Sequence, residues 1–191
     1  KNNGEIVIMV PDLYEAWHAG VSSWKKYKFL NKNSIGIEIC NPGHDHNYKK
    51  FSKKQIKSLK ILSQFLIRKY KINPKNILGH SDIAPTRKKD PGEKFPWEYL
   101  SKFGIGKWHS LSQKTLFRDR RKKITLKDKK IFFNNLSKIG YSANIPTKLK
   151  KDNFLTLITV AFQRRFRQEL INGKIDKECL IISKNIAKKF S

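Results

Sequence analysis

The sequence has few cysteines, few acidic residues and no long apolar run, and each shortage excludes a class of protein. Its 191 residues include two cysteines, Cys40 and Cys179, which lie far apart and form no CxxC pattern. This spacing excludes a disulfide scaffold and a thiolate zinc site, and it predicts two free, mostly buried thiols. No apolar run approaches the roughly 20 residues that a transmembrane helix needs. The chain starts at Lys1 rather than Met. We therefore expect an internal start and leave open a targeting segment ahead of it.

The charge balance is strongly one-sided. The chain has 15 Asp and Glu residues against 42 Lys and Arg residues, a formal net charge of +27. Such a field attracts polyanions without selecting among nucleic acid, an anionic lipid surface and a carboxylate-bearing cell wall. A biased codon composition is an equally good explanation of the excess lysine. No zinc finger, recognition helix or RNA-binding motif is present, so we expect no specific nucleic-acid partner.

The apolar pattern predicts an α/β domain in the first half of the chain. Residues 5–10, 34–40 and 77–80 read as strands, and 34–40 alternates cleanly between isoleucines and other residues. A Ser-x-x-Gln capping box at Ser52 predicts a helix to about Tyr70, whose apolar stripe is spaced to cover a sheet. Strands that alternate with a long helix favour a mixed central sheet flanked by helices.

The second half of the chain reads as a basic linker followed by helices. Helices are expected over about 126–139 and 153–171, and Asp176 is the expected N-cap of a third. We therefore predict a catalytic domain, a linker and a small three-helix domain at 1–112, 113–124 and 125–191, respectively.

The stretch GHSDIAPTRKKDPG, from Gly79 to Gly92, carries most of the chemical information. His80 and Asp90 in a Pro- and Gly-shaped loop could bind one zinc ion, and a hydrolytic zinc site needs only three protein ligands. The remaining position would hold a water molecule whose pKa the metal lowers. Taken alone, the two residues fit an ordinary strand-end histidine and a turn-forming aspartate better than a metal pair.

Three further residues are candidates for chemistry. Glu38 lies on the same side of its predicted strand as Gly36, where the missing side chain would leave room for substrate or water. Lys88 could stabilise an oxyanion. Either side chain could instead be a solvated surface charge, and His18 could be a ligand, a substrate contact or a loop residue.

The motifs together resemble a known family. AWHAG at 16–20, NSIGIEI at 33–39 and the GHSDIAPTRKKDPG stretch, in this order, resemble the zinc-dependent N-acetylmuramoyl-L-alanine amidases of the type 2 amidase family. That family contains the AmpD- and AmiD-like enzymes and is related to the peptidoglycan recognition proteins. The resemblance covers roughly residues 4–108. It implies hydrolysis of the amide bond between N-acetylmuramic acid and L-alanine in peptidoglycan or muropeptides.

The resemblance also implies roles for individual residues. His80 and Asp90 match zinc ligands, Glu38 matches the acid that activates the water, and Lys88 matches the lysine that supports the oxyanion. Trp17, His18 and Arg87 are expected to bind substrate. Family members take a further zinc histidine from a preceding strand, in an HYT-like motif. No such motif occurs here, and none of His44, His46 and His109 takes its place.

The C-terminal part resembles the three-helix peptidoglycan-binding module of AmiD-type amidases. The resemblance rests on FFNNLSKIGY at 132–141, AFQRRF at 161–166 and NGKIDKECL at 172–180. It implies a peptidoglycan or muropeptide partner and favours the cell envelope or periplasm, with the cytoplasm as the alternative. A non-catalytic peptidoglycan-binding protein that has lost full zinc coordination is the alternative function.

Overall fold

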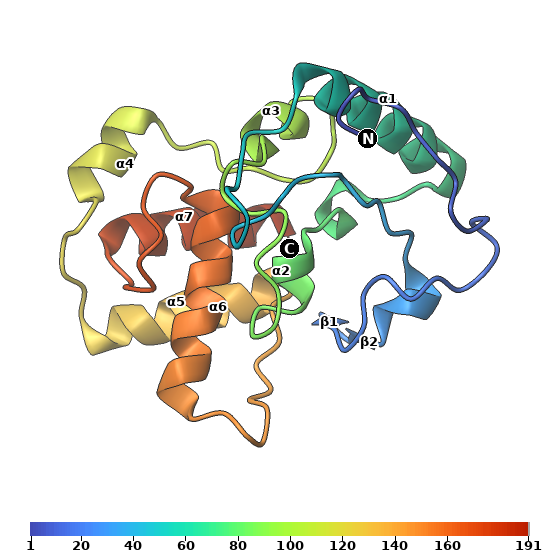
Figure 1. Ribbon diagram of the computed structural model, residues 1–191. Coiled ribbons are helices and arrows are strands. Elements are labelled where there is room, and N and C mark those ends of the chain that lie inside the picture. Colours follow the sequence, from blue (N-terminus) through green and yellow to red (C-terminus); the bar gives the residue numbers. More distant parts are fainter. Residues whose placement is uncertain (191) are drawn as a thin grey trace.

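The structure is a computed structural model that describes residues 1–190, and most of its regular structure is helical (Figure 1). Its α-helices are α1 (Lys53–Tyr70), α2 (His80–Ile83), α3 (Trp97–Ser101), α4 (Gln113–Asp119), α5 (Leu126–Ile139), α6 (Lys151–Phe166) and α7 (Lys177–Phe190). Short 3-10 helices cover Leu30–Asn33 and Pro74–Asn76. The described strands are β1 (Ser23–Trp24) and β2 (Tyr27–Lys28), which pair antiparallel.

Helix α1 confirms its predicted start and end. The Ser52 hydroxyl accepts a hydrogen bond from the Gln55 backbone N–H, and the Gln55 side chain accepts one from the Ser52 N–H, which completes the capping box. Leu59 on the apolar stripe is buried, but Phe65 is 51% exposed. The stripe is therefore not covered along its whole length, contrary to our expectation that it packs on a sheet.

The predicted mixed central sheet is absent among residues 1–190. Segments 5–10 and 34–40 form no strand, and the predicted strand 77–80 instead leads into α2. Alternation favours an extended backbone, but a strand also needs a partner for its backbone hydrogen bonds, and the described residues supply none. Ile8 and Met9 accordingly stand 82% and 80% exposed.

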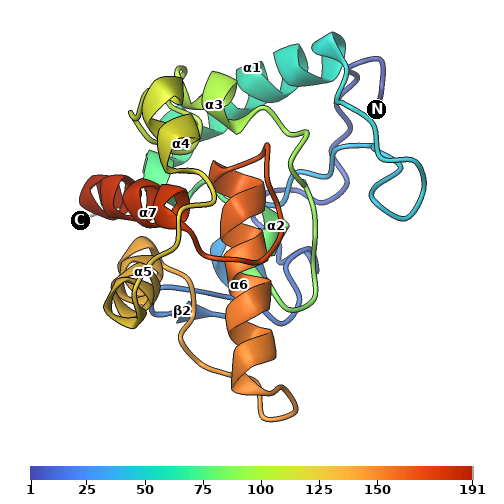
Figure 2. The same ribbon diagram turned by 90° about the vertical axis from the view of Figure 1, so that its left-hand side faces the viewer.

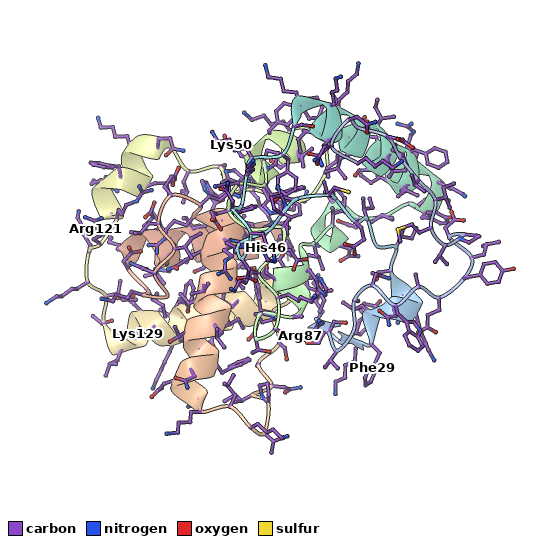
Figure 3. The ribbon with its side chains drawn as sticks, viewed as in Figure 1. Phe29, His46, Lys50, Arg87, Arg121 and Lys129 are labelled. Carbon is purple, nitrogen blue, oxygen red and sulfur yellow. The ribbon has the colours of Figure 1, made fainter. Side chains whose placement is uncertain are left out.

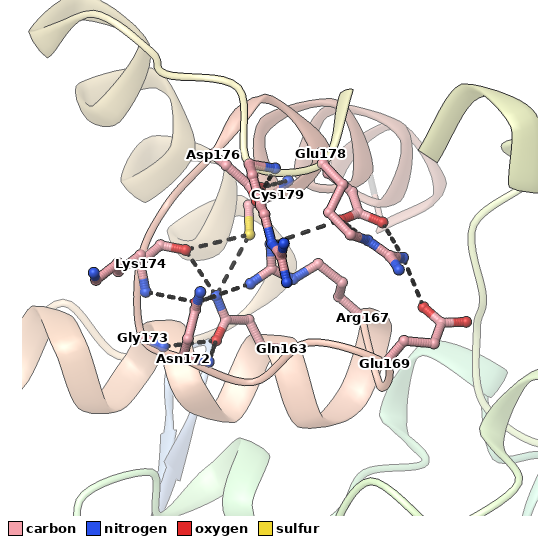
Figure 4. Close-up of polar contacts among 11 residues, drawn as sticks. Gln163, Arg167, Glu169, Asn172, Gly173, Lys174, Asp176, Glu178 and Cys179 are labelled. Atoms are coloured by element: carbon pink, nitrogen blue, oxygen red, sulfur yellow. Dashed lines mark hydrogen bonds and ion pairs between the residues drawn. The ribbon is translucent and has the colours of Figure 1, made fainter. Parts of the chain in front are cut away.

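The helices of the second half follow the sequence more closely. Helix α5 has its predicted bounds, and Asp176 caps α7 by accepting the Cys179 N–H. Helix α6 ends at Phe166 rather than near residue 171. The Gln163 side chain explains the early end, because its oxygen accepts the N–H groups of residues 172 and 173 and stabilises a turn instead (Figure 4).

Residues from both halves of the chain share the main hydrophobic core. Phe132, Phe162 and Ile182 from α5, α6 and α7 pack in one cluster with Trp24 and Leu30. The predicted linker 113–124 contains α4, whose Leu116 belongs to the same cluster. The boundaries of the three predicted units stay a prediction, and Ser191 of the third lies outside the described residues.

Buried charges hold the connection between α6 and α7. The side chains of Arg167 and Glu178 are both fully buried. Arg167 donates to Asp176 at 2.6 Å, and Arg120 donates to both oxygens of Glu178 at 2.7 and 2.8 Å (Figure 4). Each buried charge therefore has a partner, as low-polarity surroundings require.

The sequence predicts no transmembrane helix. No helix within residues 1–190 has the length and apolarity to span a bilayer.

Both cysteines are free, but Cys40 is exposed and only Cys179 is buried, which corrects the expectation of mostly buried thiols. Cys40 is exposed because the segment that carries it is covered by no neighbouring strand.

Candidate active site

The loop from Gly79 to Gly92 closes on itself and brings its two ends together. Helix α2 begins at His80, and the Ser81 N–H donates to the backbone oxygen of Asp90 at 2.8 Å. Within the loop, a second backbone hydrogen bond runs from the Lys88 N–H to Ala84 O at 2.9 Å and brings these two residues close together. The backbone thus places the side chain of Asp90 beside that of His80, ten residues earlier in the chain.

His80 and Asp90 form the pair that the sequence predicts. His80 Nδ1 lies 3.1 Å from Asp90 Oδ2, and His80 Nε2 lies 3.2 Å from the backbone oxygen of Ala19. A hydrogen on Nε2 would be donated to this carbonyl oxygen, and Arg87 Nη2 also lies 3.5 Å from Nε2. Nδ1 faces a carboxylate oxygen. A protonated ring donates a hydrogen bond to this oxygen, and a ring with its hydrogen on Nε2 directs the Nδ1 lone pair to the same side, from which a metal-ligating histidine binds.

The pair meets the chemical requirements of two zinc ligands. Two facing electron-pair donors need a cation or a proton between them. Ligand distances near 2.0–2.2 Å and a tetrahedral angle put such donor atoms roughly 3.3–3.6 Å apart, a few tenths of an ångström more than the 3.1 Å observed. Among residues 1–190, no group of three His, Cys, Asp or Glu side chains gathers as a metal site. The described residues therefore fit part of a zinc site, with two ligands.

The surroundings favour an ionised Asp90. Desolvation alone would raise the pKa of this carboxyl, but the hydrogen bond and charge of His80, together with the charge of Lys88, lower it below its usual value. Lys88 thus lies close enough to act on the site electrostatically. Its side chain has no hydrogen bond or ion pair within the described part of the chain, so its ammonium remains available to a bound group.

Glu38 lies on an extended segment rather than on a strand. Its side chain is exposed and makes no hydrogen bond or ion pair within residues 1–190. The space over Gly36 is filled, because a Cβ there would lie 2.5 Å from His18 Cγ. The predicted opening beside Gly36 is therefore wrong. His18 is held by hydrogen bonds of 2.8 Å with Ala16 O and 2.9 Å with the Ser34 hydroxyl.

The Arg87 side chain forms hydrogen bonds within the protein, whereas the Trp17 side chain is exposed to solvent. Arg87 lies on the loop after α2, and its side chain reaches the N-terminal segment (Figure 3). It donates to Ala19 O at 2.7 Å and Val21 O at 3.1 Å. Trp17 is 92% exposed and available to a ligand. The substrate-binding roles of Arg87, Trp17 and His18 stay predictions.

The sequence analysis did not predict a buried polar cluster around Asp82, two residues after His80. Asp82 accepts hydrogen bonds from Tyr141 at 2.7 Å, from Arg165 at 2.9 Å and from the Gly79 N–H at 2.7 Å. One signal of it was present. Arg165 stands at the next helical repeat of the apolar face that includes Ile158 and Ala161–Phe162, where a charge requires a buried partner.

The comparisons with known proteins identify the family of the chain. The Amidase_2 family profile, described as N-acetylmuramoyl-L-alanine amidase, matches residues 1–93. The amidase AmiD of Escherichia coli strain K12 is 35% identical over 187 residues, which is 95% of this chain and 67% of that protein. The chain belongs to the N-acetylmuramoyl-L-alanine amidase family. The anhydro-N-acetylmuramyl-L-alanine amidase AmpD of Enterobacter cloacae is 43% identical over 101 residues, about half of each protein.

Solved structures share the fold over nearly the whole chain. Escherichia coli AmiD, solved with the substrate anhydro-N-acetylmuramic acid-L-Ala-D-gamma-Glu-L-Lys, superposes with a TM-score of 0.81 at 33% identity and covers 97% of this chain and 73% of that one. AmpDh3 of Pseudomonas aeruginosa gives 0.80 at 34% identity and covers 95% of this chain and 72% of that one. The similarity therefore extends through α5–α7 as well as the His80 loop.

Proposed function

We propose that this amidase hydrolyses the bond between N-acetylmuramic acid and L-alanine in peptidoglycan or muropeptides, with a zinc-activated water. The observation that carries the proposal is the His80–Asp90 pair, 3.1 Å apart, on a fold shared with an amidase solved in complex with its substrate. His80 and Asp90 would hold the zinc ion, and the ion when bound would supply a water of lowered pKa and polarise the amide carbonyl.

The other predicted residues have separate tasks in this reaction. Water adds to the amide carbon, the C–N bond breaks, and the nitrogen of L-alanine leaves with a proton. The Glu38 carboxylate would accept the proton of the attacking water and pass it to this nitrogen. The Lys88 ammonium would stabilise the oxygen that becomes negative in the transition state. Glu38 makes no hydrogen bond or ion pair with His80 or Asp90 in the described chain, so we propose that segment 34–40 closes toward the loop when substrate binds.

The substrate would be gripped by exposed and basic surfaces. The Trp17 indole can stack on a sugar ring, and His18 and Arg87 can donate hydrogen bonds to the substrate. A net charge of +27 suits a polymer whose stem peptides carry free carboxylates. We propose that the C-terminal helices bind the same polymer and that the protein works in the cell envelope or periplasm, with the cytoplasm as the alternative.

The predicted mixed sheet belongs to the same proposal. Segments 5–10 and 34–40 carry β-type sequence patterns and expose apolar residues such as Ile8 and Ile35. Exposed apolar side chains on unpaired extended backbone favour pairing with another strand. We propose that both segments pair as strands in the active enzyme.

Zinc binding by single variants tests the metal site. His80→Ala and Asp90→Ala should each weaken zinc binding at least tenfold, measured by competition with a chromogenic chelator, because each removes one ligand. His46→Ala, which removes an exposed histidine outside the site, is the matched control and should bind as the parent does. Equal zinc affinity in all three variants would refute the assignment.

One observation favours the alternative of a non-catalytic peptidoglycan-binding protein. The described residues bring together two candidate ligands, whereas a hydrolytic zinc site needs three. If the protein binds muropeptides but not zinc, and releases no peptide, this alternative replaces the amidase activity.

A further inference from the structure

Asp82 is the meeting point of the His80 loop and the C-terminal helices. Its side chain is 3% exposed, and both carboxylate oxygens are engaged. Oδ1 accepts the Tyr141 hydroxyl at 2.7 Å, and Oδ2 accepts Arg165 Nη1 at 2.9 Å and the Gly79 N–H at 2.7 Å. Burial, followed by the charge of Asp82, raises the pKa of Tyr141 well above its usual value. The phenol therefore keeps its proton and donates it.

Arg165 is itself fixed on three sides. Besides Asp82, its guanidinium donates from Nη2 to the backbone oxygen of Ile77 at 3.0 Å. Its Cζ lies 3.3 Å from the centroid of the Trp97 ring, the stacked geometry of a cation–π contact. Arg165 thus connects α6 to the residues just before α2, and α6 lies beside α2 in both views of the fold (Figures 1 and 2).

Helix α2 depends on these contacts for its orientation. It has four residues, His80–Ile83, and a helix of one turn has no stability of its own. Asp82 caps this turn through the Gly79 N–H, and His80 lies between the two residues. The direction in which His80 presents its ring is therefore determined by where Asp82 is held.

We propose that Tyr141 and Arg165 are positioning residues of the amidase site, which act through Asp82 to orient His80 toward the metal. This inference rests on the proposed zinc amidase function. It gives the C-terminal helices a part in catalysis in addition to binding the polymer. A buried ion pair adds little net stability compared with apolar packing, so orientation is the larger contribution of this one.

Tyr141→Phe is the most selective test, because it deletes one hydroxyl and leaves Arg165 in place. Ser183→Ala is the matched control. It deletes a buried hydroxyl that accepts Asn135 Nδ2 at 3.1 Å between α7 and α5, away from α2. Zinc and cobalt affinities would be measured by chelator competition for the parent and both variants, with urea unfolding and steady-state kinetics on a muropeptide.

We expect Tyr141→Phe to weaken metal binding roughly tenfold, within the range seen for groups that orient a metal ligand. Its kcat should fall while KM stays near the parent value, and amide hydrogen exchange should accelerate in α2. Ser183→Ala should lose comparable stability with unchanged metal affinity. If Tyr141→Phe does not fold, Arg165→Lys replaces it, since lysine keeps the charge but lacks the planar fork whose two nitrogens reach Asp82 and Ile77 separately.

The outcomes separate this inference from the function on which it rests. Parent protein that binds zinc, with Tyr141→Phe or Arg165→Lys binding it equally well, would overturn the positioning role and leave the amidase intact. Parent protein that binds no zinc would overturn both.

Discussion

Trp24 tests whether the two halves of the chain fold as one unit. The side chain comes from the N-terminal half, is 4% exposed, and packs edge-on against Tyr141 at 5.2 Å and Phe190 at 6.3 Å between ring centroids. Truncating a buried Trp to Ala costs about 3–5 kcal/mol in the free energy of unfolding. The indole N–H is buried without an acceptor. The desolvation of this N–H offsets part of the stabilisation that burial of the ring provides. We therefore expect Trp24→Ala to lower the free energy of unfolding by about 3 kcal/mol.

Urea and thermal unfolding would measure this loss, with Trp17→Ala as the matched control. Trp17 is the same residue type but 92% exposed, so its removal should change stability by no more than about 0.5 kcal/mol. For a chain of this size, 3 kcal/mol corresponds to a decrease in Tm of about 6–12 °C. Equal stabilities of the two variants, or a separate unfolding step of the C-terminal helices in the parent, would refute the shared core.

Three further predictions follow from buried groups. Gly140→Ala should lower stability by about 1–3 kcal/mol in the same urea assay, because the new Cβ would lie 2.5 Å from the indole described above and φ is +138°. Glu178→Ala should cost about 3–5 kcal/mol, since it removes a fully buried carboxylate that accepts two hydrogen bonds from Arg120 and faces the buried Arg167. A loss under about 1 kcal/mol would contradict this. In a thiol-reagent titration Cys40 should react at once and Cys179 only on unfolding, because burial raises the pKa of Cys179 to about 12.

Local signals in the sequence predicted the helices well. The capping box at Ser52 placed the start of α1, and the helix expected over about 126–139 matches α5. The bounds of both helices depend on contacts between residues a few positions apart, which can be read from the sequence. The end of α6 was predicted too late because a tertiary contact of Gln163 decides it.

The strands were predicted less well because a strand depends on distant partners. Residues 34–40 alternate as a strand should, yet the described chain offers them no paired neighbour. Alternation therefore predicted the extended backbone of this segment but not its pairing.

The candidate site also contains local contacts, which the sequence predicted, and long-range contacts, which it did not. His80 and Asp90 could be paired from the sequence because one short loop carries both. Asp82 and Arg165 are 83 residues apart, and only the folded chain brings them together. A charge on the apolar face of α6 indicated a buried partner without identifying it.

Mass spectrometry of muropeptides incubated with the protein tests the central claim most directly. The protein would be supplied with zinc, or with a chelator, or as the Glu38→Gln variant. The account predicts zinc-dependent release of peptides that begin with L-alanine, abolished by the chelator and strongly reduced in Glu38→Gln. Intact muropeptides after incubation with the zinc-loaded protein, with binding to peptidoglycan retained, would contradict it.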